Sequence, residues 1–193
     1  MNNQKKFGTR EIALTALLLA ICIVSQIFKN LSIFITGPIV NACIVLAVYA
    51  TNLPCAIVLS VITPVTAYFI AASPLMMAIP GIVPLVMLGN IVIAVCSYFL
   101  LKKDMITTKP GEKVISKILK SVACALAKGV VMGLTISLWV IPTFLPEESP
   151  LRAKMPVFQM TFSVFQFITA LIGFVYVYII WYALSRYMKA PMD

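Results

Sequence analysis

The segment SVACALAKGVVMGLTISLWVIP, residues 121–142, decides how the rest of the chain is interpreted. It is apolar over the length of about 20 residues that a helix needs to cross a bilayer. Near its middle stands Lys128, with no acidic residue within one helical turn on either side. A lysine at that depth costs about 2.5–3.5 kcal/mol on insertion scales, so it normally faces a polar partner, a water-filled cavity or a ligand.

The sequence leaves two interpretations of Lys128 open. In the first, its side chain reaches the membrane interface or bonds a free backbone carbonyl. In the second, Lys128 is a cation that binds a solute. Beside it, Ala125, Gly129 and Gly133 recur every four residues. Such a stripe of small residues lets a neighbouring helix approach closely.

Composition defines the broad class of the protein. Of its 193 residues, 62% are hydrophobic and 11% are charged, and the mean hydropathy is +1.04. A soluble domain carries about 25% charged residues. The net charge is +9, but the basic residues flank apolar runs, where they set membrane topology. We therefore expect an all-α membrane protein in a lipid bilayer, with one transmembrane domain over residues 1–193 and no nucleic-acid partner.

Metal and cofactor chemistry finds no support in the sequence. Histidine is absent, and the five cysteines form no C-x-x-C pair. Each cysteine lies in or beside an apolar run, where it is expected to be a small buried hydrophobe. We expect no cofactor, no metal and no catalytic residue. The cysteines are Cys22, Cys43, Cys55, Cys96 and Cys124.

Hydropathy predicts six membrane spans. The first has a basic region before its apolar region, as a signal peptide has, but the apolar part continues to Phe28 without a convincing cleavage site. We interpret it as a retained span. Two connections, residues 29–38 and 72–80, are unusually apolar for exposed loops. The predicted spans are residues 9–28, 39–49, 55–71, 81–101, 118–142 and 157–183.

Charge placement predicts the orientation. With the N-terminus inside, eleven Lys and Arg residues lie on the inner side and three on the outer side, and Lys128 lies within the membrane. Inner loops carry the excess of positive charge in membrane proteins. Both termini are therefore expected in the cytoplasm. The protein itself is expected in the plasma membrane of a bacterial cell.

Several polar side chains are expected at similar depth, in the middle and outer half of the membrane. The two apolar loops cap the same side, so the sequence predicts a pocket that opens outward and binds a small solute. The residues expected to bind the substrate are Lys128, Asn90, Gln159, Gln166, Asn41, Tyr68 and Trp139. No nucleotide-binding P-loop occurs, so uphill movement of a solute would take its energy from a partner.

The first span carries a face of small residues. Ala13, Ala16 and Ala20 lie on it, and the last two form an A-x-x-x-A pair. A lipid-facing helix has no need of such a face, which favours contact with another helix. The sequence leaves open whether that helix belongs to this chain or to a partner.

The ordered set of motifs resembles the substrate-binding S components of energy-coupling factor (ECF) transporters. The resemblance spans nearly the whole chain, although each motif is loose and apolar. It is carried by ALTALLLA (13–20), GPIVN (37–41), TPVTAYF (63–69), IPGIVPLVMLGN (79–90) and ALAKG (125–129).

The resemblance implies a fold, partners and a site. It implies a six-span bundle that docks through Ala16 and Ala20 onto a membrane coupling subunit, which carries two ATP-binding subunits. It also implies a vitamin or related small molecule bound on the outer side. The residues it implies there are Asn90, Lys128, Gln159 and Gln166, with Asn41 and Tyr68 as weaker candidates.

Three other classes are weighed against this one. A self-sufficient secondary transporter or small permease would show inverted repeats and interrupted helices in matching halves. No convincing repeat relates spans 1–3 to spans 4–6, although Thr63–Pro64 and Pro84 are helix breakers. An intramembrane enzyme needs an acid, base and nucleophile at one depth, and the acidic residues all flank the spans. A structural subunit of a larger complex would bind no ligand.

Overall fold

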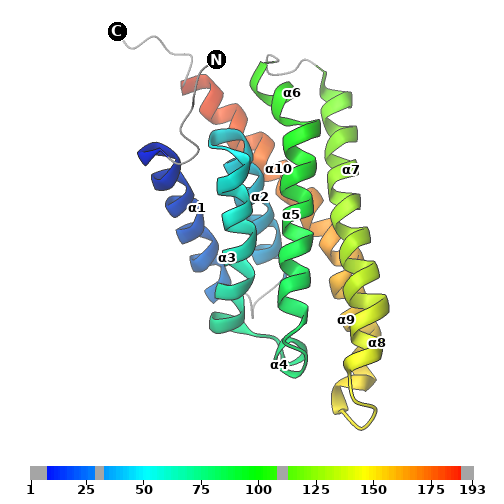
Figure 1. Ribbon diagram of the computed structural model, residues 1–193. Coiled ribbons are helices and arrows are strands. Elements are labelled where there is room, and N and C mark those ends of the chain that lie inside the picture. Colours follow the sequence, from blue (N-terminus) through cyan, green and yellow to red (C-terminus); the bar gives the residue numbers. More distant parts are fainter. Residues whose placement is uncertain (1–7, 29–32, 108–112, 188–193) are drawn as a thin grey trace.

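The computed structural model describes residues 8–28, 33–107 and 113–187 as a bundle of helices (Figure 1). In chain order these are α1 (Thr9–Ile27), α2 (Ile33–Ala50), α3 (Leu53–Ala71), α4 (Pro74–Ala78), α5 (Ile82–Leu100), α6 (Lys102–Thr107), α7 (Val114–Met132), the π-helix η1 (Gly133–Val140), α8 (Ile141–Phe144), the 3-10 helix η2 (Pro150–Lys154), α9 (Met155–Phe162) and α10 (Val164–Tyr187). Six stretches are long and apolar enough to cross a membrane. The prediction of an all-α, six-span membrane protein is confirmed.

Short helices mark the two ends of the bundle. Figure 1 shows α6 at one end, together with the beginning of α1 and the end of α10, and α4 and α8 at the other. We call these the α6 end and the α4 end. The excess of basic residues beside α6 makes the α6 end the expected cytoplasmic side.

The second span begins earlier than the sequence predicted. The helix α2 starts at Ile33 rather than at residue 39, and it contains Pro38 in its second turn. A proline so close to the beginning of a helix removes few intrahelical hydrogen bonds, which explains why Gly37–Pro38 does not end the preceding loop. Of the predicted apolar loop 29–38, residues 33–38 are therefore helical, and residues 29–32 lie outside the described residues.

The second predicted loop, 72–80, also contains a helix. Ser73 caps α4, because its hydroxyl accepts a hydrogen bond from the backbone N–H of Met76 at 3.3 Å. Pro74 follows at the first helical position, where its lack of an N–H costs nothing.

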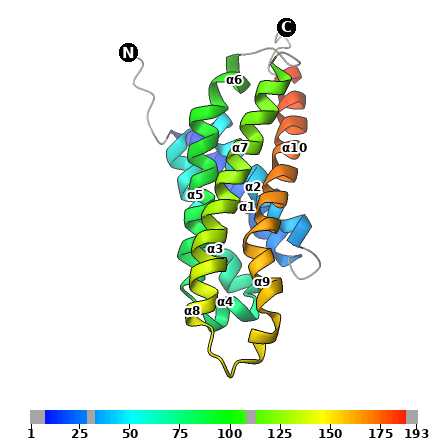
Figure 2. The ribbon, with the colours of Figure 1, turned by 90° about the vertical axis from the view of Figure 1, so that its right-hand side faces the viewer.

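The fifth and sixth spans are longer than predicted, and each changes geometry along its length. Residues 114–144 run without a turn from α7 through η1 into α8. The last span is divided at Ser163, whose backbone (φ −119°, ψ −85°) separates α9 from α10. Figure 2 shows these two spans side by side along the bundle, and a Cβ added to Gly133 would lie 3.3 Å from the Cβ of Ser163.

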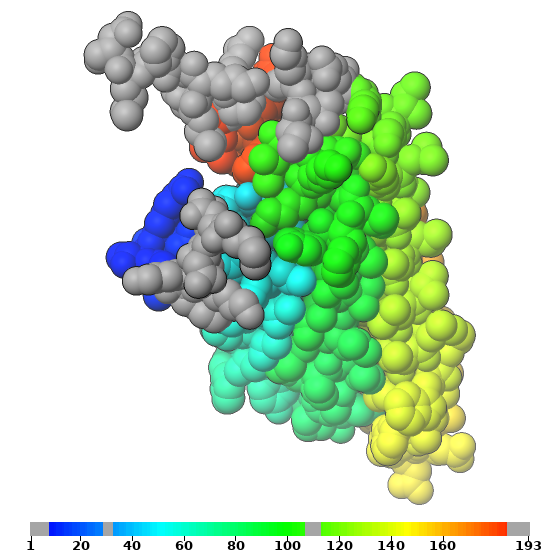
Figure 3. Space-filling model, turned by 45° about the horizontal axis from the view of Figure 1, so that its top comes forward, coloured from blue at the N-terminus to red at the C-terminus, as the bar shows by residue number. Residues whose placement is uncertain are grey.

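The helix α2 is the centre of the bundle. It packs against α1, α3, α5 and α10, and every residue from Asn41 to Tyr49 is buried. A helix that is hydrophobic all round is expected in such a place. By contrast, α1 buries only Cys22, Ser25 and Gln26, and Figure 3 shows it at the edge of the molecule.

Two apolar clusters hold the described helices together. The larger one surrounds α2 and includes Ile44, Leu59 and Ile93. The smaller one joins α4, α7, η1, α8 and α9, and includes Leu75 and Ile136. Met76 and Phe162 of the smaller cluster also line a cavity in the α4 half of the bundle.

Candidate binding site

Lys128 joins three helices by its side chain. Its Nζ on α7 donates to Asn41 Oδ1 on α2 at 2.5 Å and to Asn90 Oδ1 on α5 at 2.8 Å. All three side chains are almost fully buried, with exposed fractions of 3%, 2% and 3% for Lys128, Asn41 and Asn90. Hydrogen bonds from an ionised donor are about twice as strong as neutral ones, so the two amides favour the charged form of this buried amine.

Glycines beside these residues allow the helices to meet closely. A Cβ on Gly89 would lie 2.5 Å from Met132 Cγ, and a Cβ on Gly129 would lie 3.0 Å from Phe167 Cβ. Gly89 precedes Asn90 on α5, and Gly129 follows Lys128 on α7. The small residues therefore bring α5 and α10 against α7 at the depth of the lysine.

A cavity of about 380 Å³ lies next to this network. Its volume falls in the range of small-molecule sites, about 300–1,000 Å³. Most of its wall is apolar, with a few amide and hydroxyl groups. The lining residues come from eight helices and the α3–α4 connection: Gln26, Ile33, Thr36, Gly37, Val40, Asn41, Thr63, Pro64, Ala67, Ala71, Ala72, Ser73, Pro74, Met76, Val86, Asn90, Lys128, Val157, Phe158, Thr161, Phe162 and Gln166.

Four of the predicted site residues meet at this cavity. Lys128, Asn90, Asn41 and Gln166 all line it. Gln166 donates only a long hydrogen bond, from Nε2 to the carbonyl of Thr161 at 3.3 Å. Among the described lining residues, Lys128 is the only Lys, Arg, Asp or Glu.

Three of the predicted site residues lie outside the lining. Gln159 bonds to the π-helix, with its Nε2 donating to the Ser137 carbonyl at 2.9 Å and the Ser137 hydroxyl donating to the Gln159 carbonyl at 2.8 Å. Tyr68 packs on the cluster around α4 and η1. Trp139 is 58% exposed on the bundle surface. None of these three residues lines the cavity.

Gln26 is a lining residue that the sequence analysis missed. It is 1% exposed, and its Nε2 donates to the Thr63 carbonyl at 2.9 Å. That carbonyl directly precedes Pro64, a helix breaker already visible in the sequence. An amide in the last turn of an otherwise apolar first span was the available signal.

Two polar atoms beside the cavity have no hydrogen-bond partner within the described part of the chain. They are Asn41 Nδ2 and Gln26 Oε1, and both are buried. Buried polar groups are paired in the great majority of cases, so each unpaired group needs an explanation.

The small-residue face of α1 points away from the bundle. Ala13, Ala16 and Ala20 are all exposed, and Leu17 between them is 58% exposed. None of the described helices therefore packs closely on the alanines, and the described part of the chain gives no support to the alternative of contact within the chain.

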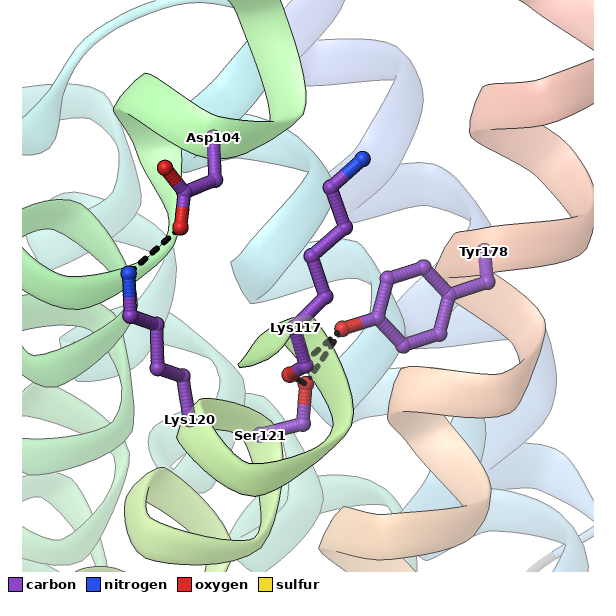
Figure 4. Close-up of polar contacts among 5 residues, drawn as sticks. All are labelled: Asp104, Lys117, Lys120, Ser121 and Tyr178. Carbon is purple, nitrogen blue, oxygen red and sulfur yellow. Dashed lines mark hydrogen bonds and ion pairs between the residues drawn. The ribbon is translucent and has the colours of Figure 1, made fainter. Parts of the chain in front are cut away.

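The α6 end carries a second polar cluster, drawn in Figure 4. Lys120 forms an ion pair with Asp104, and the Tyr178 hydroxyl donates to the Lys117 carbonyl at 3.0 Å and lies 2.5 Å from the Ser121 hydroxyl. The hydrogen bond from Lys120, aided by the charges of nearby lysines, lowers the pKa of Asp104. These contacts tie α6 and α10 to α7.

The described residues contain no group of three or more His, Cys, Asp or Glu side chains placed to hold a metal ion. Comparisons with protein-family models, with curated proteins and with solved structures find no match. The fold and composition define a multi-pass membrane protein with six apolar helices, and the assignment of a function rests on the cavity and its polar groups.

Proposed function

We propose that this chain is the membrane-embedded substrate-binding subunit of an ECF-type ABC importer. It captures a small water-soluble vitamin or related micronutrient from outside the cell. It then delivers the solute with a membrane coupling subunit and two ATP-binding subunits, in the plasma membrane of a bacterium.

The observation that carries the proposal is the cavity beside Lys128. Its lining is mostly apolar and holds a few convergent polar groups, which is the usual construction of a small-molecule site. A lysine buried inside a membrane span marks a candidate functional site. The charge bias of the sequence supports an orientation in which the α4 end, and with it the cavity, faces the outside.

Two further features support a subunit rather than a complete transporter. The sequence has no P-loop, and the four acidic residues that the structure describes, Glu11, Asp104, Glu147 and Glu148, lie outside the cavity lining, so neither ATP hydrolysis nor a carboxylate proton relay is expected from this chain. The exposed alanines of α1 offer a close-packing surface to another membrane protein.

A self-sufficient secondary transporter is the second candidate. The observation in its favour is the interruption of two neighbouring spans, by the π-helix η1 and by the break at Ser163. Transporters of this class build their sites from discontinuous helices. Such a protein would move its solute without ATP-binding partners.

Native mass spectrometry separates these candidates. The tagged chain is extracted gently from the membranes of its own host and ionised with its ligands and partners attached. A bound mass of a few hundred daltons, together with complexes that contain a membrane subunit and two ATPases, is the expected result. A chain that carries a solute but never an ATPase favours the secondary transporter. A chain that stays empty and alone after incubation with a vitamin panel overturns both.

A further inference from the structure

The side-chain amides of Asn41 and Asn90 both turn their oxygen, a hydrogen-bond acceptor, toward Lys128. A lysine ammonium has three donors and no acceptor, so both amides must present oxygen to it, as Asn41 Oδ1 and Asn90 Oδ1 do. The NH₂ group of Asn41 consequently faces away from the lysine and has no partner within the described residues. Two of the three ammonium protons are used by the amides. The third ammonium proton and the NH₂ group of Asn41 therefore remain to donate hydrogen bonds at this wall of the cavity.

At Gln26, the one lining residue from α1, the unpaired group is an acceptor rather than a donor. The Thr63 carbonyl can only accept, so Gln26 must present its Nε2 there, and Gln26 Oε1 is left as an acceptor without a partner in the described chain. Figure 1 shows α1 and α7 at opposite edges of the bundle. The cavity lining therefore offers donors at Lys128 and Asn41 and an unused acceptor at Gln26.

The charge of the cavity selects among ligand classes. Lys128 is the one basic residue among the described lining residues, and none of them is acidic. A monoanion would pair with the ammonium form of Lys128 in a place of low dielectric, where pairing is strong. A phosphate ester, which carries about −1.5 to −2 at neutral pH, would bring a surplus of negative charge into the cavity. A carboxylate fits the single lysine.

We infer that the solute is a carboxylic acid that carries an N–H or O–H donor at its other end. Its carboxylate lies between Lys128 Nζ and Asn41 Nδ2, and its donor bonds to Gln26 Oε1. This inference rests on the proposed function, because the solute is the one that the subunit captures. It adds the ligand class and makes Gln26 a specificity-determining residue.

The test uses the full chain in lipid nanodiscs and asks what it retains. The protein is incubated with a water-soluble metabolite extract of its host and washed, and the retained compounds are released and identified by mass spectrometry. Carbodiimide coupling to aniline adds one fixed mass increment for each carboxyl group. A retained compound that shows this increment is the expected result. A retained compound without a carboxyl group overturns the inference but leaves the proposed function standing, and no retained compound at all overturns both.

A direct affinity comparison uses the retained compound and its primary amide. The amide keeps the shape and removes the charge, so the acid is expected to bind the wild-type chain at least about tenfold more tightly, a difference of about 1.4 kcal/mol. Equal binding of acid and amide overturns the inference. Because this comparison needs no variant, misfolding of a variant cannot affect it.

The role of Gln26 is tested by a matched pair of glutamine variants. Gln26→Leu is expected to weaken binding at least about fivefold, whereas Gln159→Leu, away from the cavity, is expected to leave affinity within about twofold. Thermal unfolding of both variants is recorded alongside. Unchanged affinity of Gln26→Leu, or an equal loss in both variants, would remove Gln26 from the site.

Discussion

Lys128 and Asn41 are separated by 87 residues in the chain and are joined by a hydrogen bond of 2.5 Å between Nζ and Oδ1. This bond links α7 to the central helix α2, and the matching bond to Asn90 adds α5. One side chain thus fixes the relative position of three spans at the edge of the cavity. The network affects the stability of the fold and has a proposed role in binding. Variants that are measured for both unfolding and ligand retention separate the two.

Removing the lysine alone is expected to destabilise the protein. Lys128→Met leaves the oxygens of Asn41 and Asn90 buried without a donor, at a cost of about 1–3 kcal/mol for each group, which the removal of a buried charge partly offsets. We expect a net loss of about 1–3 kcal/mol. The triple variant Lys128→Met, Asn41→Leu, Asn90→Leu removes every member of the network, and such replacements are often neutral or stabilising.

The measurement is the thermal unfolding midpoint in one detergent, with ligand retention recorded in parallel. The triple variant should unfold at or above the wild-type temperature and retain no ligand. A triple variant that is less stable than Lys128→Met would show that the network mainly stabilises the fold.

Gln159 and Gln166 are expected to behave differently, although they lie seven residues apart in one predicted span. Gln159 exchanges two hydrogen bonds with Ser137 of η1, and the bond from its side chain is worth about 0.5–1.5 kcal/mol. Gln159→Leu should therefore lower the unfolding temperature and preserve binding. Gln166→Leu should weaken binding with little loss of stability, because its one protein bond is long. Parallel melting curves and ligand titrations of the two variants check this, and the reverse pattern would exclude Gln166 from the site.

Hydropathy predicted much of this structure because membrane spans are defined by length and apolarity. The convergence of Lys128, Asn90, Asn41 and Gln166 was also predictable, since polar groups in apolar spans need one another. Depth along a span does not give direction around it, which is why Trp139 was expected in the pocket and lies on the surface instead.

The remaining differences come from local backbone geometry. The break at Ser163 changes the phase between α9 and α10, so a spacing of seven residues no longer keeps Gln159 and Gln166 on one face. The π-helix η1 changes the number of residues per turn in the facing span. Neither feature has a proline at its position, and hydropathy alone gave no sign of either one.

Gly173 is expected to be intolerant of even one methyl group. A Cβ at this position would lie 2.9 Å from Asn41 Cβ and 3.0 Å from the Pro38 carbonyl. Gly173→Ala should separate α10 from α2 and cost about 1–3 kcal/mol, against a gain of up to about 1 kcal/mol in helix propensity. The control is Gly81→Ala, where a Cβ meets no atom of the structure within 4 Å. Equal unfolding temperatures of the two variants would contradict the close packing of α10 on α2.

Stability is expected to fall in acid through Asp104. The hydrogen bond from Lys120 holds the pKa of Asp104 below its ordinary value of 3.8. A carboxylate with a lowered pKa in the folded protein contributes stability above its unfolded pKa and loses that contribution as the pH falls through the folded value. Unfolding temperatures measured from about pH 6 to about pH 3 should therefore decline below about pH 4. In Asp104→Asn this decline should be smaller, and an identical pH profile would show that the Lys120 pair adds nothing.

The exposed alanines of α1 give a test of the proposed partners. Ala16→Trp and Ala20→Trp place a large side chain where close helix packing would need a small one, on a surface that none of the described helices covers. Stability and ligand retention should stay at wild-type levels, because neither residue is buried. The amount of ATP-binding subunit that co-purifies from host membranes should fall at least about tenfold, because the added indole prevents close helix packing. Ala183→Trp, at an exposed position on α10, controls for added bulk on the surface. If all three variants recover the ATPases equally well, the alanine face of α1 is a lipid surface and the coupling subunit, if one exists, docks elsewhere.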